Sequence, residues 1–105
     1  MFDAYQVQRA LRGHLAEDDV MENLARDEAT GAFWVLTRRE LLIVKDLQIV
    51  DRLDRTAVAG EVSTSDVGVT VRVRGSDRAK VLVGTFRKAC RLTDALTELV
   101  QDHPR

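Results

Sequence analysis

The side chains that could support acid–base or metal chemistry are few and lie far apart in this 105-residue sequence. The two histidines, His14 and His103, stand near opposite ends, and the single cysteine, Cys90, has no second cysteine or nearby histidine to act with it. Metal sites and activated nucleophiles both require such groups in clusters. The sequence also contains no Gly-x-Ser-x-Gly motif and no glycine-rich phosphate loop. We therefore predict no catalytic residue, no metal site, no cofactor, and a protein that is not an enzyme.

Two weaker chemical signals have simpler interpretations. The acidic run at residues 17–19 could attract a cation, but adjacent residues do not share a face, so a solvated turn is the simpler interpretation. Cys90 lies between Lys88 and Arg91, which would favour a thiolate, so a small hydrolase using Cys90 is one hypothesis and a cysteine that only packs is the simpler one. A single cysteine forms no internal disulfide, which agrees with a reducing compartment.

Basic residues suggest a second kind of site. Arg72 and Arg74 are two positions apart on the polar face of a predicted strand, ~7 Å from each other. With Lys88 and Arg91 they could form a surface for an anionic ligand such as a membrane headgroup. No aromatic side chains are interleaved with these charges, so we expect no nucleic-acid partner. The simpler alternative is a solvated strand face whose arginines pair with nearby acids.

The element that organises the chain is a predicted β-hairpin at residues 32–45, which we call the central hairpin. Two short apolar runs flank the polar residues 37–40, as in a hairpin with a four-residue connection. Because successive side chains of a strand point to opposite faces, Phe33 and Trp34 face opposite ways and both faces of the hairpin are apolar. Both faces must therefore be covered.

One cover is the core of the domain, and the other is either the rest of the chain or a partner. Trp34 and Leu36 share a face that could dock a protein, since tryptophan is enriched at interface centres. The alternatives are that the N-terminal helix covers Trp34 within the same chain, or that a second copy does so. The candidates for a protein interface are Trp34, Leu36, Leu42, Val44, Tyr5 and Leu11.

A helix is predicted over residues 1–15. Asp3 is a suitable N-cap, and Gln6 stands three residues later, as in a capping box. Phe2 and Val7 have the spacing of a hydrophobic staple. Gly13 weakens the end of this helix.

The rest of the chain is predicted to be mainly strands. Residues 20–26 fit a strand or a helix equally well, and the pattern leaves both open. Strands follow at residues 49–53 and 57–63, where Gly60 suggests a bulge or sharp bend. The next strand alternates apolar with polar residues, and its valines on one face are Val67, Val69, Val71 and Val73. It is predicted to form a long hairpin with residues 79–86 after a turn at residues 75–78.

An amphipathic helix at residues 88–101 closes the chain, so the order is helix, about seven strands and helix, which predicts one antiparallel α+β domain. Charge is uneven: residues 1–31 carry a net −4 and residues 32–105 a net +3. No apolar run reaches the ~20 residues needed to span a bilayer, and the first twelve residues include charges. We therefore expect a cytoplasmic protein.

The order of these patterns resembles a known family. Residues 31–42, a glycine, an apolar strand, Thr37, basic residues and a second apolar strand, are similar to a segment of bacterial pleckstrin-homology-like (PH-like) domains. The resemblance extends over residues 18–101, including Leu53 and Gly68. It implies a strongly bent antiparallel barrel of seven strands plugged by the C-terminal helix, and it favours the strand at residues 20–26. Residues 1–15 would be a helical extension of a domain at residues 16–105, covering part of the hairpin's second face.

Relatives of this fold hold lipid headgroups with basic residues around the loop between the first two strands. Here that loop, residues 27–30, is acidic, and carboxylates beside a phosphate cost energy. We therefore predict a non-catalytic protein-interaction module, which could bind a second copy of itself. The alternative is a module for an anionic ligand that uses the basic strand face.

Overall fold

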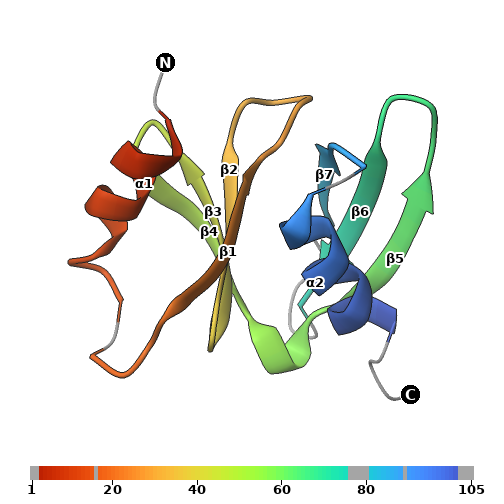
Figure 1. Ribbon diagram of the computed structural model, residues 1–105. Helices are drawn as coiled ribbons and strands as arrows, with labels where there is room; N and C mark the ends of the chain where they lie inside the picture. Colours follow the sequence, from red (N-terminus) through yellow and green to blue (C-terminus); the bar gives the residue numbers. More distant parts are fainter. Residues whose placement is uncertain (1–2, 16, 76–80, 89, 102–105) are drawn as a thin grey trace.

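The computed structural model describes residues 3–15, 17–75, 81–88 and 90–101. Figure 1 shows a helix beside one sheet, a second sheet, and another helix packed between the two sheets. The elements in order are α1 (Ala4–Leu11), β1 (Met21–Arg26), β2 (Phe33–Thr37), β3 (Glu40–Lys45), β4 (Gln48–Asp54), the 3-10 helix η1 (Arg55–Ala57), β5 (Ala59–Thr64), β6 (Val69–Arg74), β7 (Leu82–Phe86) and α2 (Arg91–Gln101).

The seven strands form two antiparallel sheets. The first has the order β1-β2-β3-β4 and the second the order β5-β6-β7. Helix α2 packs against β5, β6 and β1, so it fills the space between the sheets (Figure 1). This arrangement confirms the predicted antiparallel α+β fold with a C-terminal plug. Neither helix in the described part of the chain has the length and apolar character needed to cross a bilayer.

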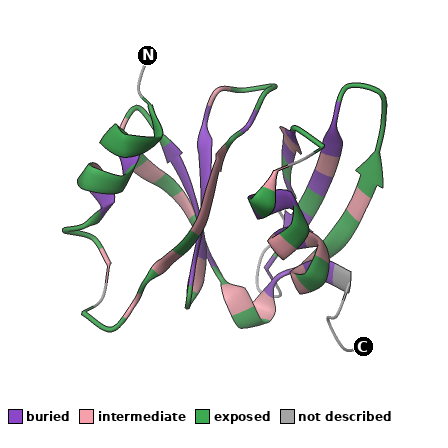
Figure 2. Ribbon diagram, viewed as in Figure 1, coloured by how far each residue is buried: buried purple, intermediate pink, exposed green. Residues whose placement is uncertain are grey.

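The central hairpin is β2 and β3. Leu36 pairs with Leu41, which leaves the four-residue connection predicted from the sequence. Every residue of β2 is buried, and residues 41–44 of β3 are buried as well (Figure 2). The prediction that both faces are covered is therefore confirmed. Residues 21–26 are strand β1, paired with β2, so the strand is the correct one of the two possibilities left open.

The two faces of the hairpin belong to two separate apolar cores. The inner core, between the sheets and α2, contains Trp34 and Leu36. The outer core, beneath α1, contains Phe33, Val35, Leu42 and Val44 with Val7 and Leu11 of the helix. The prediction that the N-terminal helix covers Trp34 is wrong, because α1 covers the opposite face. Strand alternation separates the two faces but carries no information about which cover each one receives.

Helix α1 starts as predicted and ends early. The Gln6 backbone N–H donates to Asp3 Oδ1 at 2.9 Å, and the Asp3 N–H donates to Gln6 Oε1 at 2.9 Å, which completes the capping box. The helix ends at Leu11 rather than at residue 15, shortly before Gly13, a poor helix former. The predicted staple involves Phe2, which lies outside the described residues.

The second sheet differs from the sequence prediction in two places. Val69, Val71 and Val73 are buried as expected, but Val67 is 84% exposed because it lies in the turn before β6 begins. No bulge occurs at Gly60, where the pairing of β5 with β6 continues without a shift. A Cβ atom at Gly60 would lie 1.8 Å from the carbonyl oxygen of Arg72, so glycine permits close approach of the two backbones.

The C-terminal predictions agree within a few residues. Strand β7 begins at Leu82, and α2 begins at Arg91. Leu92, Leu96 and Val100 are buried in the inner core, as the helical spacing predicts. The turn positions 76–78, the predicted strand positions 79–80 and the helix position 89 lie outside the described residues.

A missing side chain at Gly84 makes room for the largest residue of the inner core. The ring centroids of Trp34 and Phe86 are 5.3 Å apart in an edge-to-face arrangement with an interplanar angle of 77°. A Cβ atom at Gly84 would lie 2.7 Å from Trp34 Cζ2 and 2.8 Å from Phe86 Cε2. Glycine is therefore required at position 84 for this aromatic pair to pack between the sheets.

Substitution Gly84→Ala should lower the free energy of unfolding by about 1–3 kcal/mol, because the added methyl group forces the two rings apart. Urea unfolding followed by Trp34 fluorescence measures this change. The matched control is Gly13→Ala, since no atom lies within 4 Å of the Cβ position there. A Gly84→Ala protein as stable as Gly13→Ala would contradict this account of the packing.

Candidate functional site

Most of the residues proposed for a protein interface are enclosed by the chain itself. Trp34, at 2% exposure, and Leu36 lie in the inner core. Leu42, Val44 and Leu11 lie in the outer core beneath or within α1. The sixth candidate, Tyr5, is 62% exposed on the outer side of α1. The structure thus divides the six between two cores and a helix surface and does not bring them together.

The four basic residues proposed for an anionic ligand are exposed but dispersed. Arg72 and Arg74 lie on the outward face of β6, and Arg72 Nε is 3.5 Å from Glu61 Oε1. Arg74 ends β6, and Val69 begins it, ~17 Å away along the strand. Val69 pairs with Phe86 at the end of β7. Lys88 follows the Phe86 end of β7, so it lies at the opposite end of β6 from Arg74; Arg91 begins α2.

The acidic loop between β1 and β2 contains a carboxylate that is not solvated. Asp27 is 1% exposed. Its Oδ1 accepts hydrogen bonds from the backbone N–H of Ala29 at 2.9 Å and of Thr85 at 3.1 Å, and its Oδ2 accepts one from Thr30 Oγ1 at 2.9 Å. The Glu28 N–H also donates to the Thr85 carbonyl at 2.7 Å. These bonds attach the loop of the first sheet to β7 of the second.

Sequence reasoning missed Asp27 because its acidic neighbours made the loop appear fully solvated. A usable signal was present: Asp27, Thr30 and Gly31 have the spacing of a turn in which the aspartate side chain bonds the following backbone. That signal predicts the local bonds to Ala29 and Thr30. It does not predict the bond to Thr85, which is distant in sequence.

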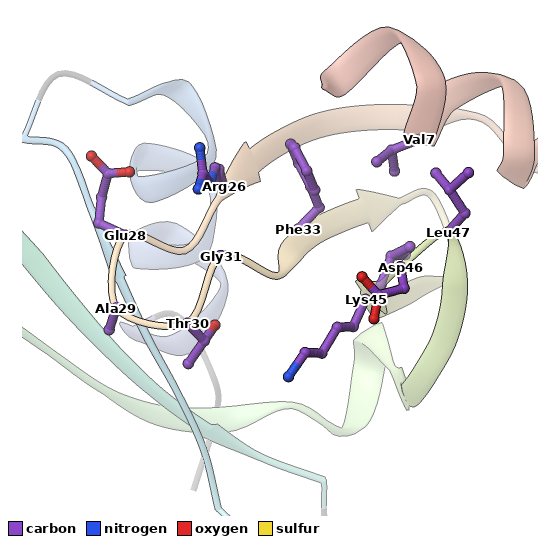
Figure 3. Close-up of a pocket in the computed structure, with 11 residues that line it drawn as sticks. Val7, Arg26, Glu28, Ala29, Thr30, Gly31, Phe33, Lys45, Asp46 and Leu47 are labelled. Atoms are coloured by element: carbon purple, nitrogen blue, oxygen red, sulfur yellow. The ribbon is translucent and has the colours of Figure 1, made fainter. Parts of the chain in front are cut away.

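A hollow of about 530 Å³ lies between the β1–β2 loop and the β3–β4 turn. Figure 3 shows Arg26 and Glu28 on the loop side and Lys45 and Asp46 on the turn side. Glu28 also forms an ion pair with Arg87, at 3.4 Å. Charges of both signs thus surround the hollow, which gives no net attraction for a phosphate. Its apolar wall is formed by Val7, Phe33, Val44 and Leu47.

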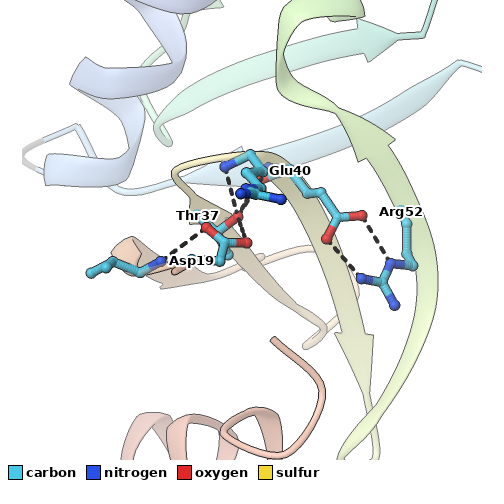
Figure 4. Close-up of polar contacts among 6 residues, drawn as sticks. Asp19, Thr37, Glu40 and Arg52 are labelled. Atoms are coloured by element: carbon cyan, nitrogen blue, oxygen red, sulfur yellow. Dashed lines mark hydrogen bonds and ion pairs between the residues drawn. The ribbon is translucent and has the colours of Figure 1, made fainter. Parts of the chain in front are cut away.

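The acidic run before β1 pairs with the tip of the central hairpin. The buried Thr37 hydroxyl donates to Asp19 Oδ2 at 3.0 Å and accepts from the Glu40 N–H at 2.9 Å, as Figure 4 shows. Asp18 forms an ion pair with Arg39. In the described part of the chain, no three histidine, cysteine or acidic side chains come together as metal ligands.

Glu40 also reaches the neighbouring strand. Arg52 Nη2 lies 2.7 Å from Glu40 Oε2, and Arg52 Nε lies 3.0 Å from Glu40 Oε1. This hydrogen bonding raises the pKa of the Arg52 guanidinium above its ordinary value, with added attraction from the charges of Glu40 and Asp19. The pair therefore fixes the β3–β4 hairpin and does not offer a free cation.

Cys90 is partly buried just before α2 and packs against the inner core. This position suits the simpler interpretation, a cysteine that only packs. His14 is exposed in the turn after α1, and His103 lies outside the described residues.

Among the edge strands of the two sheets, β7 offers the most favourable surface for binding a partner. Strands β1 and β5 lie against α2. Edge strand β4 carries a bulge, where Val50 has no partner between the pairs of Ile49 and Asp51, and charged residues follow it. Bulges and charges are the usual protection of exposed edges. Strand β7 contains no charged residue and shows no shift in its pairing with β6.

The outer edge of β7 is used at Thr85 and open at Val83. The N–H and C=O of Thr85 both point away from β6, toward Asp27 and Glu28. Because these groups alternate in direction along an antiparallel strand, those of Val83 point the same way. They have no hydrogen-bond partner among the described residues. The side chains of Val83 and Val81 are 47% and 36% exposed beside this edge.

Two solved structures resemble this chain over nearly its whole length. A DUF1696 family protein with a pleckstrin-homology domain from Shewanella loihica PV-4 shares 14% identity with a TM-score of 0.69, covering 97% of this chain and 93% of that chain. A pleckstrin homology domain from Shewanella amazonensis SB2B shares 11% identity with a TM-score of 0.63, covering 99% and 90%. The fold is PH-like.

The resemblance found in the sequence is thus confirmed for the fold. No family model matches the sequence, and no curated protein matches it significantly. PH-like folds host many functions, so the function has to be argued from the surface.

Substitution Asp27→Ala should lower the free energy of unfolding by roughly 2–3 kcal/mol, because the Thr85 N–H loses its acceptor between the sheets. Chemical denaturation measures the loss. Asp66→Ala is the control, since Asp66 is exposed in the β5–β6 turn. Hydrogen exchange should also show faster exchange at the Thr85 amide in Asp27→Ala. Unchanged protection of Thr85 would show that Asp27 does not hold β7.

Proposed function

We propose that this protein is a non-catalytic protein-interaction module that binds an extended segment of a partner along the free edge of β7. The observation that carries the proposal is the combination of unpaired backbone groups at Val83 with exposed valine side chains and no charge on that strand. An extended peptide that adds a strand to a sheet edge is a recurring mode of recognition. Backbone hydrogen bonds supply affinity, and alternate side chains supply specificity.

The surroundings of Val83 define the partner's chemistry. Val83 pairs with Arg72, which pairs with Glu61, so the three side chains form one row across the outer face of the second sheet. A partner strand would extend this row with the residue placed beside Val83. An apolar or β-branched residue there would bury the exposed part of Val83. Pairing would stop at Thr85, whose outward groups are already bonded to the β1–β2 loop.

A second copy of the chain could supply such a strand. An antiparallel pair of β7 strands about a twofold axis would use the same surface on both copies. This is the self-associating form of the proposal, and it can be tested with the purified protein.

The alternative function, binding of an anionic ligand through Arg72, Arg74, Lys88 and Arg91, has less support. Arg72 pairs with Glu61, and the sheet register separates Arg74 from the Phe86 end of β7. Liposome flotation tests this alternative: binding to acidic vesicles that is lost at high salt and in Arg72→Ala/Arg74→Ala would favour it.

Substitution Val83→Lys should weaken binding at the β7 edge by at least about tenfold, because it removes the apolar contact beside the added strand and places a second positive charge next to Arg72. Light scattering over a wide concentration range measures self-association, and capture of native partners measures binding to other proteins. Val67→Lys is the control, since it places the same charge on an exposed valine away from this edge.

The amide of Val83 provides a direct readout. It should exchange rapidly in the dilute protein and become protected on association, because its N–H gains an acceptor. Partner binding that persists in Val83→Lys, or that leaves the Val83 amide of the bound protein unprotected, would rule out this edge as the binding site.

A further inference from the structure

Helix α1 is attached to the first sheet almost entirely by two side chains. Val7 and Leu11 are fully buried in the outer core, while Ala4, Tyr5, Gln6, Gln8 and Arg9 are exposed. The polar side-chain contacts of α1 remain within the helix and its cap: the capping box, and Arg9 at 5.7 Å from the Tyr5 ring centroid. In the described chain, no side-chain hydrogen bond or ion pair joins α1 to the sheet beneath it.

The helix also covers this face incompletely. Hollows of about 530, 480 and 650 Å³ border α1 or the turn that follows it. Val7 lines the first, His14 the second, and Gln8 the third. An eight-residue helix is too short to be stable by itself in water, so its structure depends on this limited contact.

Among its described residues, the connector after α1 is held by hydrogen bonds and an ion pair at its far end, and by Leu15, which packs partly buried against the outer core. Asp18 pairs with Arg39, Asp19 accepts from Thr37, and the Arg38 N–H donates to the Val20 carbonyl at 2.9 Å. Before that point the residues at 12–14 are exposed and belong to no helix or strand. Six residues thus separate Leu11 from Asp18, enough to span about 20 Å when extended.

We propose that α1 is exchangeable, and that the outer face of the first sheet also receives α1 from a second copy of this chain. In the exchanged dimer, Val7 and Leu11 of each copy would pack on Phe33, Val35 and Leu42 of the other. The contact is the one already present within the chain, so its fit is preserved, and reciprocal exchange closes a twofold dimer. The inner core, which holds the two sheets together, takes no part in the exchange.

This exchange is independent of strand addition at β7, because α1 contributes no residue to the second sheet or its edge. Val83→Lys should therefore leave the exchange unchanged. The two proposals can fail separately.

The first test shortens the connector in the full chain by deleting residues 12–14, so that α1 reaches its own sheet less easily. The shortened protein should have twice the mass of the wild-type protein at the same concentration, as measured by light scattering. Val7→Asp/Leu11→Asp should abolish this dimer, and Tyr5→Asp, a change on the exposed side of α1, should keep it. A shortened protein that stays monomeric with α1 protected from hydrogen exchange, or a dimer that survives Val7→Asp/Leu11→Asp, would overturn the proposal.

The second test needs no deletion. A synthetic peptide of residues 1–15 is added to the isotope-labelled wild-type chain, and half of the resident helix should be displaced at a peptide concentration on the order of millimolar, the effective concentration of a short tether. The amide signals of Val7 and Leu11 should then become those of an unstructured chain, while those of Val35 and Leu42 remain folded. A peptide carrying Val7→Asp/Leu11→Asp should displace nothing. Equal effects of the two peptides, or no displacement by the wild-type peptide, would overturn the proposal.

Discussion

One buried carboxylate ties the β1–β2 loop of the first sheet to β7 of the second. Asp27 has lost nearly all of its contact with water, and its hydrogen-bond donors are two backbone N–H groups and a hydroxyl. Removing a carboxylate from water is costly, and the cost is offset only where donors are already in place around it. Two of the donors belong to its own loop, and the third, at Thr85, belongs to the opposite sheet. The same contact therefore orders the loop, joins the sheets and fixes where the free edge of β7 ends.

Much of the fold could be predicted because it follows from local patterns. The apolar runs on both sides of Thr37 predict a hairpin enclosed on both faces, and Asp3 with Gln6 predicts the start of α1. The assignment of each face to its cover could not be predicted. Phe33 and Trp34 are both large and apolar, and only the three-dimensional path of α1 and α2 decides which of them meets the helix and which meets Phe86.

The candidate site was less predictable, because it consists of backbone groups that no other element of the described chain bonds. The edge at Val83 stands out because the other edge strands are covered or bulged, and it is bounded because Thr85 is already bonded across the sheets. Each of these conditions depends on residues far from Val83 in the sequence, such as Asp27, which bonds Thr85. The candidate Trp34 illustrates the converse: its type suggests an interface, but Gly84 leaves a space that places it inside the protein.

The extra residue in β4 has a consequence for assembly. A sheet that is open on two sides can recruit subunits at both and grow into a fibre, whereas a sheet open on one side terminates after a single addition. Val50 interrupts the regular ladder on one flank of the molecule. Because Val50 blocks regular pairing on that flank, a protomer that accepts a strand at β7, as proposed, would accept none at β4, and strand addition alone would not build a fibre.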